Sequence, residues 1–554
     1  MSAWLAGFVL CALLLVLALP SSAPAARGLV TGFEDGDQFQ SQAASIRTEV
    51  FNRAVDAQAG IVRLAVIWPA IATSGRPADP TNPGSASYNF PPGLDGAVRD
   101  ARARGLTVLL AVNGAPDYAE EPGRPASVVN AFSWKPIPSD VADFMQAVAA
   151  RYSGNFAPAG EPPLPAAQAI EVWNEVNSSD WITPQFEGRT AVGPERYRSM
   201  LNLSYNSIKA VNPGMLVVAG ATEPYGDPPG GPYPPGSQRV QPVQFWEQLL
   251  CVRSAKGKKK KGKKRKSRFV RTSCPAKPQF DVLSHHPIDN TGGGPLRSGP
   301  RKGDVSTPDL GKVVRVLRGA ERLGNVSPGG RHPVWATEFW WDSKPPNPVG
   351  APLAKQARWI EQTFYLFWKA GASVAINFQI VDANTRPDVH AGYQAGVFFI
   401  DGRAKPSLTA FRFPFVTERI NKSTLRAWGK APEAGKLKIQ RKQGKRWKTV
   451  KKLKVGKGAV FLAKLRLRGK QQLRAVVGKS QSLVWKQGAF GARNPGGGGG
   501  GRTGTIILAL IAALSFIVLA TAVLRRRRRR QWKPRRPRPV PGRAAASAEA
   551  GEIR

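Results

Sequence analysis

Eight short aliphatic runs alternate with stretches of helical periodicity, and this alternation constrains the fold more than any other feature of the chain. Continuous apolar runs are typical of parallel strands that are buried on both faces. The runs are Leu29–Phe33, Ile61–Trp68, Leu106–Val112, Ala169–Glu175, Met215–Ala221, Phe280–His286, Pro333–Glu338 and Ser373–Gln379. The predicted helices are Leu94–Arg104, Ser139–Tyr152, Pro194–Val211, Val243–Leu250, Pro308–Leu323, Pro352–Ala370 and Ser407–Phe413. Eight such units predict an α/β fold, a (β/α)8 barrel over residues 28–415.

A doubly wound open sheet also alternates strands and helices. We disfavour it because no glycine-rich phosphate-binding turn follows the first run. Polar residues stand instead at the ends of many runs, as expected of a barrel whose active site collects at the carboxyl ends of its strands. Long loops rich in proline and glycine account for a segment longer than the ~250 residues typical of this fold.

The pattern changes after the predicted barrel. Residues 416–490 show short alternating runs separated by Gly and Lys turns, which predicts a small all-β sandwich with basic outer faces. A Gly-rich linker, 491–504, precedes Thr505–Leu524, an uncharged segment long enough to cross a bilayer as a helix. Arg525–Arg530 then opens a basic tail, 525–554. The positive-inside rule predicts a cytoplasmic tail, and a nucleic-acid patch is the weaker interpretation of these arginines.

Residues 1–26 have the pattern of a secretory signal peptide. Ala3–Leu19 is almost entirely apolar, and Ala23 and Ala25 fit the small-x-small cleavage pattern. A retained signal anchor is the alternative, because the segment lacks Lys and Arg before its apolar part. With the C-terminal segment, this pattern predicts a single-pass cell-membrane protein whose barrel is extracellular.

Basic charge is concentrated outside the predicted barrel core. The 554 residues include 81 Lys and Arg against 37 Asp and Glu, a formal net charge of +44. Most of the excess lies in Lys256–Arg268, in the sandwich and in the tail. We expect these segments to be solvated or to contact anionic envelope polymers or lipids, with no nucleic-acid partner.

Two cysteines, Cys251 and Cys274, bracket a basic insertion at 252–273. In an extracellular protein this arrangement predicts a disulfide that closes the base of the insertion. Two unpaired thiols are the alternative. A zinc site is disfavoured because no histidine lies nearby at ligand spacing.

Two predicted strand ends carry a carboxylate beside polar or aromatic residues. Glu175 lies in Trp173–Asn177, and Glu338 lies in Thr337–Trp341. Two carboxylates with aromatic platforms, and no predicted metal or cofactor, suit glycoside hydrolysis. One acid protonates the leaving oxygen, and the other attacks the anomeric carbon or activates water.

Alternation along the two strands gives different expectations for these carboxylates. On the seventh strand, Val334, Ala336 and Glu338 share one face, so we expect Glu338 to point to the mouth. On the fourth, Asn174 has the inward parity of Ile170 and Val172, so Glu175 needs a local bulge to enter the mouth.

Other strand ends supply candidate substrate-binding residues. The candidates are Arg63, Trp68, Asn113, Asn174, His286, Trp340, Phe378 and Gln379. Adjacent strand residues point to opposite faces, so we expect His285 to pack in the structure if His286 lines the mouth. We expect the same of Trp340 and Trp341: one ring faces the sugar and the other packs in the core.

The motif Trp173–Asn177 resembles the Asn-Glu acid/base motif of the retaining glycoside hydrolases of clan A. The strand ending Ala336–Phe339 resembles that clan's nucleophile strand, and Gly396–Phe411 is similar to the close of family 39-like and family 5-like barrels. The resemblance covers residues 28–414. It implies a TIM-barrel glycosidase with Glu175 as acid/base and Glu338 as nucleophile.

The resemblance also implies roles around the two carboxylates. Asn174 would donate to the substrate 2-hydroxyl, Arg63 would lie near the nucleophile, and His286 would lie on the substrate side. The predicted reaction is double displacement on an extracellular oligosaccharide, polysaccharide or glycoside. It requires Glu338 to start ionised and Glu175 protonated, so we expect Glu175 to have the raised pKa.

Two alternatives remain open at the level of sequence. One is a non-catalytic carbohydrate- or envelope-binding protein on a glycosidase-like barrel. The other is a basic adhesion protein in which the barrel is a spacer. Retention of both glutamates favours the enzyme.

Overall fold

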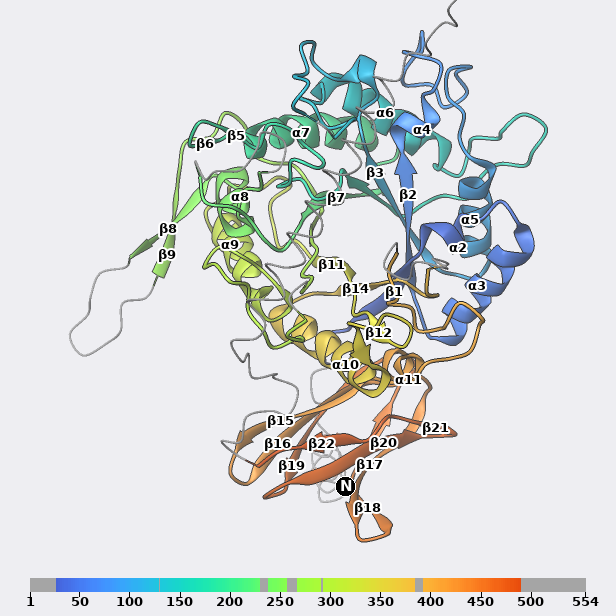
Figure 1. Ribbon diagram of the computed structural model, residues 1–554, viewed down its shortest axis with the longest axis vertical. Coiled ribbons are helices and arrows are strands. Elements are labelled where there is room, and N and C mark those ends of the chain that lie inside the picture. Colours follow the sequence, from blue (N-terminus) through green and yellow to red (C-terminus); the bar gives the residue numbers. More distant parts are fainter. Residues whose placement is uncertain are drawn as a thin grey trace, which may run out of the picture. The chain divides into compact units, whose positions relative to one another are not determined.

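The computed structural model describes residues 26–128, 130–229, 238–256, 267–289, 292–383 and 392–489. Eight parallel strands close into a barrel in the order β1-β14-β11-β10-β7-β4-β3-β2 (Figure 1). Their bounds are β1 Val30–Glu34, β2 Ile61–Ile67, β3 Thr107–Asn113, β4 Ala169–Val172, β7 Leu216–Thr222, β10 Val282–His285, β11 Val334–Phe339 and β14 Val374–Phe378. The predicted (β/α)8 barrel is confirmed, with every strand within three residues of its predicted bounds.

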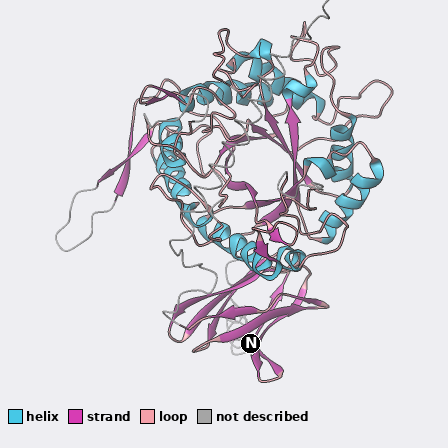
Figure 2. Ribbon diagram, in the orientation of Figure 1, coloured by secondary structure: helices cyan, strands magenta, loops and turns pink. Residues whose placement is uncertain are grey.

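Helices surround the ring of strands (Figure 2). The long ones are α3 Ala44–Asp56, α5 Pro92–Ala103, α6 Pro138–Arg151, α7 Gly193–Val211, α8 Pro242–Leu249, α9 Gly311–Arg322, α10 Leu353–Ala370 and α11 Pro406–Arg412. The sequence analysis missed α3. Only Val50, Phe51 and Ala54 of its thirteen residues are buried, and the apolar Ile46 is exposed, so the helical pattern is short and weak.

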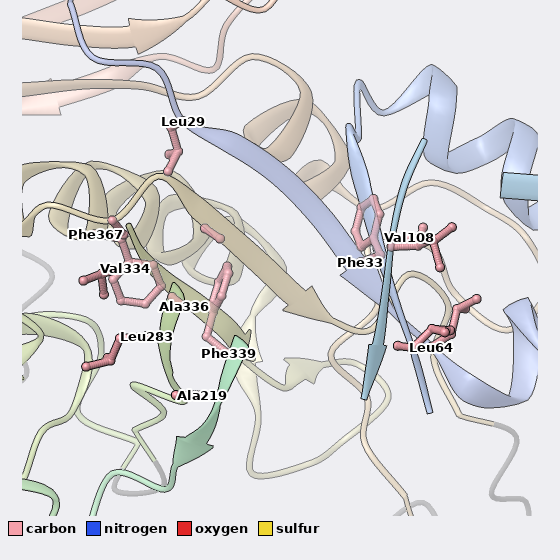
Figure 3. Packing of buried hydrophobic residues seen from close by; sticks show 14 of the residues in the cluster. Leu29, Phe33, Leu64, Val108, Ala219, Leu283, Val334, Ala336, Phe339 and Phe367 are labelled. Carbon is pink, nitrogen blue, oxygen red and sulfur yellow. The ribbon is translucent and has the colours of Figure 1, made fainter. Parts of the chain in front are cut away.

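The core of the barrel has two layers, one inside the ring of strands and one between the strands and the helices. Inside the barrel lie Ile61, Leu109, Ala169, Val218, Val282, Trp335, Val374 and Ile376. The larger cluster lies between strands and helices, and includes Val334, Ala336, Phe339 and Phe367, which gather in Figure 3. The interior apolar layer fills one end of the barrel and leaves the carboxyl ends of the strands for polar side chains.

A β-sandwich follows the barrel, as predicted. Its three-stranded sheet is β15-β16-β19, and its larger antiparallel sheet is β18-β17-β20-β21, with β22 paired to β20. The bounds are β15 Phe415–Asn421, β16 Thr424–Lys430, β17 Gly435–Gln443, β18 Arg446–Val455, β19 Val460–Arg466, β20 Gln471–Val477, β21 Ser480–Gln481 and β22 Trp485–Gln487. Trp428 of β16 packs on Tyr365 of α10, whose hydroxyl donates to Glu418 of β15.

The basic insertion forms a two-stranded hairpin, β8 Val252–Lys256 and β9 Ser267–Arg271. A disulfide joins Cys251 and Cys274 at its base, as predicted. Residues 257–266, most of the predicted basic tract, lie outside the described residues.

The predicted signal segment, the linker, Thr505–Leu524 and the tail also fall outside the described residues. Within the described ranges, no helix is both long and apolar enough to cross a membrane.

Candidate active site

A buried arginine organises the polar layer at the carboxyl end of the barrel. Arg63 of β2, whose side chain is 3% exposed, donates from Nε to Glu171 Oε2 at 2.7 Å and from Nη1 to Glu34 Oε2 at 2.6 Å. Its Nη2 donates to Asn174 Oδ1 at 2.8 Å, and Nη1 lies 3.5 Å from Glu338 Oε2. The three neighbouring carboxylates outweigh burial and raise the pKa of Arg63, so its charge is permanent.

Beneath the two candidate carboxylates lies a third that is fully buried. Glu171 of β4 accepts hydrogen bonds from Arg63, from Ser284 Oγ at 2.6 Å and from Thr337 Oγ1 at 3.0 Å. These residues come from four different strands. They link β2, β4, β10 and β11 across the barrel interior and fix the position of Arg63.

The strand parities predicted for the two carboxylates are wrong. On β4, Ala169 and Glu171 point into the barrel, whereas Ile170 and Val172 pack in the layer shared with the helices. On β11, Trp335 points inward, and Val334 and Ala336 point outward.

Irregular backbone brings both carboxylates to the mouth despite these parities. The register of β11 against β14 shifts between Ala336 and Phe339, and this irregularity turns Glu338 inward. Strand β4 ends at Val172, three residues before its predicted end. Trp173 and Glu175 then take positive φ angles of 76° and 38°. The local departure that the sequence required for Glu175 is thus present, and Glu338 needs one as well.

The turn after β4 is held from two sides. Tyr197 Oη donates to the Val172 carbonyl at 2.8 Å, and Trp173 Nε1 donates to the Trp181 carbonyl at 2.9 Å. A Cβ at Gly220 of β7 would stand 2.3 Å from the Val172 carbonyl oxygen, so only glycine allows the turn to lie this close. The fold therefore fixes the turn that carries Glu175.

One histidine nitrogen lies between the two candidate catalytic carboxylates. His286 Nδ1 is 3.1 Å from Glu175 Oε1 and 3.6 Å from Glu338 Oε2. These two oxygens are therefore separated by no more than the two distances together, about 6.7 Å. Retaining glycosidases hold their carboxyl groups ~5–5.5 Å apart, and inverting ones ~6.5–9.5 Å. A contact of both carboxyls with one imidazole nitrogen favours the shorter, retaining separation.

The two carboxylates differ in their hydrogen bonds and in the direction of their pKa shifts. Burial raises the pKa of Glu338 to about 8, and repulsion from Glu34 and Glu175 raises it further. The positive charges of His286 and Arg63 lower this pKa but do not offset the increase. Burial also acts on Glu175, but His286 and a 3.2 Å hydrogen bond from Trp181 Nε1 outweigh it and lower its pKa. This pKa order favours the proton on Glu338, which is the reverse of the sequence prediction.

Charge balance accounts for that proton. Glu34, Glu171, Glu175 and Glu338 surround only two cationic groups, Arg63 and His286. Burial opposes the charge of His286, but Glu338 and Glu175 overcome it and raise the pKa of its imidazole. Four carboxyls face two cationic groups, and their mutual repulsion in a partly buried site favours retention of a proton on one of them.

The two adjacent histidines divide as expected. His285 is fully buried, with Nδ1 2.8 Å from Thr222 Oγ1 and Nε2 2.7 Å from the Val305 carbonyl oxygen. Burial lowers its pKa to about 4, so it is a neutral packing residue. His286 Nε2 is buried with no hydrogen-bond partner among the described residues.

Aromatic rings form a wall beside the carboxylates. Trp340 packs edge-on against Phe378 at 6.0 Å and Tyr393 at 4.9 Å between ring centroids. Gln379 Nε2 donates to the Tyr393 carbonyl at 2.9 Å and holds this segment against the end of β14. Trp341 lies in the core against Trp359, so the two adjacent tryptophans divide as predicted.

Trp68 does not lie in this wall. Its ring is 1% exposed, stacks on Phe144 of α6 at 4.8 Å and meets the edge of Tyr118. A ring covered on its face by α6 cannot offer that face to a sugar, so the expected substrate contact is corrected to a packing role. Asn113 ends β3 at the carboxyl end of the barrel, 6% exposed.

A cavity of about 270 Å³ adjoins the aromatic wall. Trp340, Trp341 and Trp359 line it, together with Asp342 and Lys355. Lys355 Nζ lies 4.6 Å over the Trp359 ring. The cavity combines flat apolar surfaces with charged hydrogen-bonding groups, the composition of a sugar-binding subsite.

The sequence analysis missed several residues of the site. Glu34 and Glu171 are single acids within strands, and only the closed barrel brings them to Arg63. Trp181 and Tyr393 lie in loops and carry no local signal. Glu223 follows β7, and burial with repulsion from Glu175 raises its pKa well above the ordinary value. Its position two residues after the predicted strand Met215–Ala221 is a signal that could have identified it.

The described residues contain no group of three His, Cys, Asp or Glu side chains arranged to hold a metal. The site brings together two carboxyls, an imidazole between them and a fixed guanidinium.

No protein-family model matches this chain, and no curated protein matches its sequence. Among solved structures, it is similar to a family 39 glycoside hydrolase from the gut symbiont Bacteroides cellulosilyticus, at 15% identity and TM-score 0.45, over 79% of this chain and 81% of the other. A GH5_18 protein from Streptomyces cattleya in complex with GlcNAc shows 17% identity and TM-score 0.43, over 70% and 79%.

A GH30 endoxylanase from Clostridium papyrosolvens shows 11% identity and TM-score 0.41, over 81% of this chain and 96% of its own. Families 39 and 5 are those whose motifs this sequence resembles. At these identities and scores, the likeness decides nothing about this chain. The fold assignment rests on its strand order, and the functional assignment on its site.

Proposed function

We propose that this protein is a retaining glycoside hydrolase that acts by double displacement. The observation that carries the proposal is that Glu175 and Glu338 both lie beside His286 Nδ1. Their oxygens nearest this nitrogen are therefore within about 6.7 Å of each other. Carboxyls that share one hydrogen-bonding nitrogen suit a mechanism in which the second carboxylate attacks the anomeric carbon directly.

The proposed reaction begins with a shift of one proton. His286 Nδ1 gives its proton to Glu175 and takes the proton of Glu338, since the same nitrogen lies near both. Glu338 then attacks the anomeric carbon while Glu175 protonates the leaving oxygen. Formation of the ester removes the charge of Glu338. Glu175, now ionised, takes a proton from the water that releases the sugar.

Arg63 and Asn174 position the reacting groups. Arg63 Nη1 lies 3.5 Å from Glu338 Oε2, so its charge favours the ionised nucleophile during attack. Arg63 Nη2 also donates a hydrogen bond to Asn174 Oδ1. This bond fixes the orientation of the amide, so that its Nδ2 is available to donate to a substrate hydroxyl.

The proposed substrate is an oligosaccharide or polysaccharide rather than a single sugar unit. Trp340 belongs both to the wall beside the carboxylates and to the 270 Å³ cavity. A glycan can therefore place one ring at the carboxylates and another in the cavity. Trp faces supply the apolar contact that sugar rings accept.

The proposed location is the outer face of the cell membrane, with Thr505–Leu524 as the anchor and 525–554 in the cytoplasm. Its support is the uncharged segment followed by six arginines. Protease added to intact cells should remove the barrel and spare the tail. Protection of the barrel would contradict this topology.

A panel of aryl glycosides tests the activity. We expect the wild type to hydrolyse at least one member, and Glu338→Ala and Glu175→Ala to lose most of that turnover. Azide should restore turnover to Glu338→Ala with an inverted product, because it occupies the space of the lost carboxylate. Binding of glycans with no turnover by any of the three proteins would indicate a sugar-binding barrel instead.

A further inference from the structure

The β-sandwich contains a large excess of basic residues and almost no acids. Between residues 415 and 489 the only acidic residues are Glu418 and Glu433. Glu418 is engaged by Lys369, Tyr365 and Arg426, and Glu433 accepts from the Ser480 backbone amide at 3.0 Å. The lysines of the larger sheet therefore have no acid of this domain left to pair with.

Alternation gathers many of these cations on one face of the larger sheet. Leu437 and Ile439 of β17, with Leu473 and Ala475 of β20, are buried against the other sheet. The residues between them point outward. The outward cations of β17, β18 and β20, which we call the basic face, are Lys436, Lys438, Lys442, Lys452, Lys454 and Arg474.

Like charges stand directly opposite each other on this face. Lys436 pairs in register with Lys454, and Lys438 with Lys452. Directly opposed like charges destabilise an antiparallel pair. The fold retains this repulsion twice in succession, and a bound anion would relieve it.

One cation of the basic face is held rigidly. Arg474 Nε donates to Gln440 Oε1 at 2.8 Å, and its guanidinium lies 4.2 Å over the Trp447 ring. A fixed planar fork loses little conformational entropy on binding, and it suits a phosphate or carboxylate.

We propose that the basic face binds a linear anionic polymer that lies along strands β17 and β18 (Figure 1). Alternate residues of a strand lie ~6.6–6.8 Å apart and neighbouring strands ~4.8 Å apart, so the ammonium groups form a flat double row. Single exposed ion pairs contribute little, ~0–1 kcal/mol each. Useful affinity therefore requires many anions on one chain.

A bilayer surface is the less suitable partner. Membrane-bound faces combine basic residues with apolar side chains that insert between the lipids. Along β17, β18 and β20, which are fully described, no large apolar side chain is among the exposed ones. The only outward aromatic ring, Trp447, is half-buried under Arg474.

Lysine acetylation of the full-length protein in detergent tests the proposal. The probe is inorganic polyphosphate of about 100 units, with tripolyphosphate as the length control. We expect polyphosphate to slow acetylation of Lys436, Lys438, Lys452 and Lys454 by roughly fivefold or more. Acetylation of Lys464 on β19 and of Lys470 in the turn after β19 should be unchanged. Peptide mass spectrometry resolves these sites, so binding by other basic segments does not obscure the result.

Two matched variants, each with four substitutions, add an affinity measurement. K436E/K438E/K452E/K454E should weaken polyphosphate binding by roughly tenfold or more and reduce its salt dependence. K464E/R466E/R468E/K470E makes the same change in net charge on β19 and the turn that follows it, and should change affinity less than about threefold.

Three results would overturn the proposal. Equal losses in both variants, or uniform protection, would mean attraction to net charge alone. Equal protection by tripolyphosphate would mean a small-anion site. Protection by vesicles of about 70% phosphatidylcholine and 30% phosphatidylglycerol, but not by polyphosphate, would mean a membrane surface. None of these outcomes depends on glycosidase activity.

Discussion

Replacement of Glu34 by Gln should shift the pH dependence of kcat/KM without removing either catalytic carboxyl. Activity requires one proton on the Glu175–Glu338 pair. In the free protein that proton is lost at the pKa of Glu338, about 8. The alkaline limb of kcat/KM should therefore fall near pH 8, and the acid limb should lie below the ordinary glutamate range, because the pKa of Glu175 is lowered.

The size of the shift follows from Arg63 Nη1. This nitrogen is 2.6 Å from Glu34 Oε2 and 3.5 Å from Glu338 Oε2, so the two oxygens are at most about 6.1 Å apart. Unit charges at that distance repel by roughly 2.7 kcal/mol at an effective dielectric of about 20, which is about two pKa units. Loss of the Glu34 charge also leaves Arg63 Nη1 free to interact more strongly with Glu338. This interaction lowers the pKa of Glu338 as well.

We therefore expect Glu34→Gln to move the alkaline limb roughly one to two units toward acid. The assay is kcat/KM from pH 4 to 10 with the best aryl glycoside, on variants whose fold is verified by circular dichroism. Glu49→Gln, an exposed acid paired with Arg53 on α3, is the matched control and should leave the limb in place. An unchanged or more alkaline limb in Glu34→Gln would refute the charge balance deduced for the site.

Three further predictions concern stability and binding. A carboxyl whose pKa is higher in the folded than in the unfolded protein destabilises the fold as pH rises from the unfolded pKa, 4.5, to the folded pKa, about 8. Glu338→Gln should therefore raise the Tm more at pH 8 than at pH 4.5, and an equal increase at both would contradict this. Unreduced protein should yield Cys251 and Cys274 in one linked peptide pair, and their joint replacement by Ala should cost about 3 kcal/mol in urea unfolding. Trp340→Ala should reduce kcat/KM roughly tenfold, and an unchanged value would remove it from the sugar site.

The barrel could be predicted from sequence because parallel strands buried on both faces form continuous aliphatic runs. The same property hides which residues point inward. Ile170 and Glu171 are both fully buried, one against the helices and the other inside the barrel. A carboxylate inside a barrel is tolerated only with partners such as Arg63, and those partners come from other strands.

That Glu175 and Glu338 lie at the mouth of the barrel could also be predicted, but not their protonation. Motif position identified Glu175 and Glu338 from a few neighbouring residues. Their pKa order depends on which carboxyl receives the hydrogen bonds of His286 and Trp181, and on the acids around Arg63 and His286. His286 and Glu175 are 111 positions apart, and the residues around Arg63 come from different strands, so no local pattern encodes the pKa order.

Trapping of the glycosyl-enzyme tests the central claim most directly. A 2-deoxy-2-fluoro glycoside with a good leaving group should add one sugar to the wild-type protein. Peptide mapping by mass spectrometry should place that sugar on Glu338, and nuclear magnetic resonance should show that the first product of ordinary turnover keeps its anomeric configuration. A sugar on Glu175, or a first product with inverted configuration, would contradict the account.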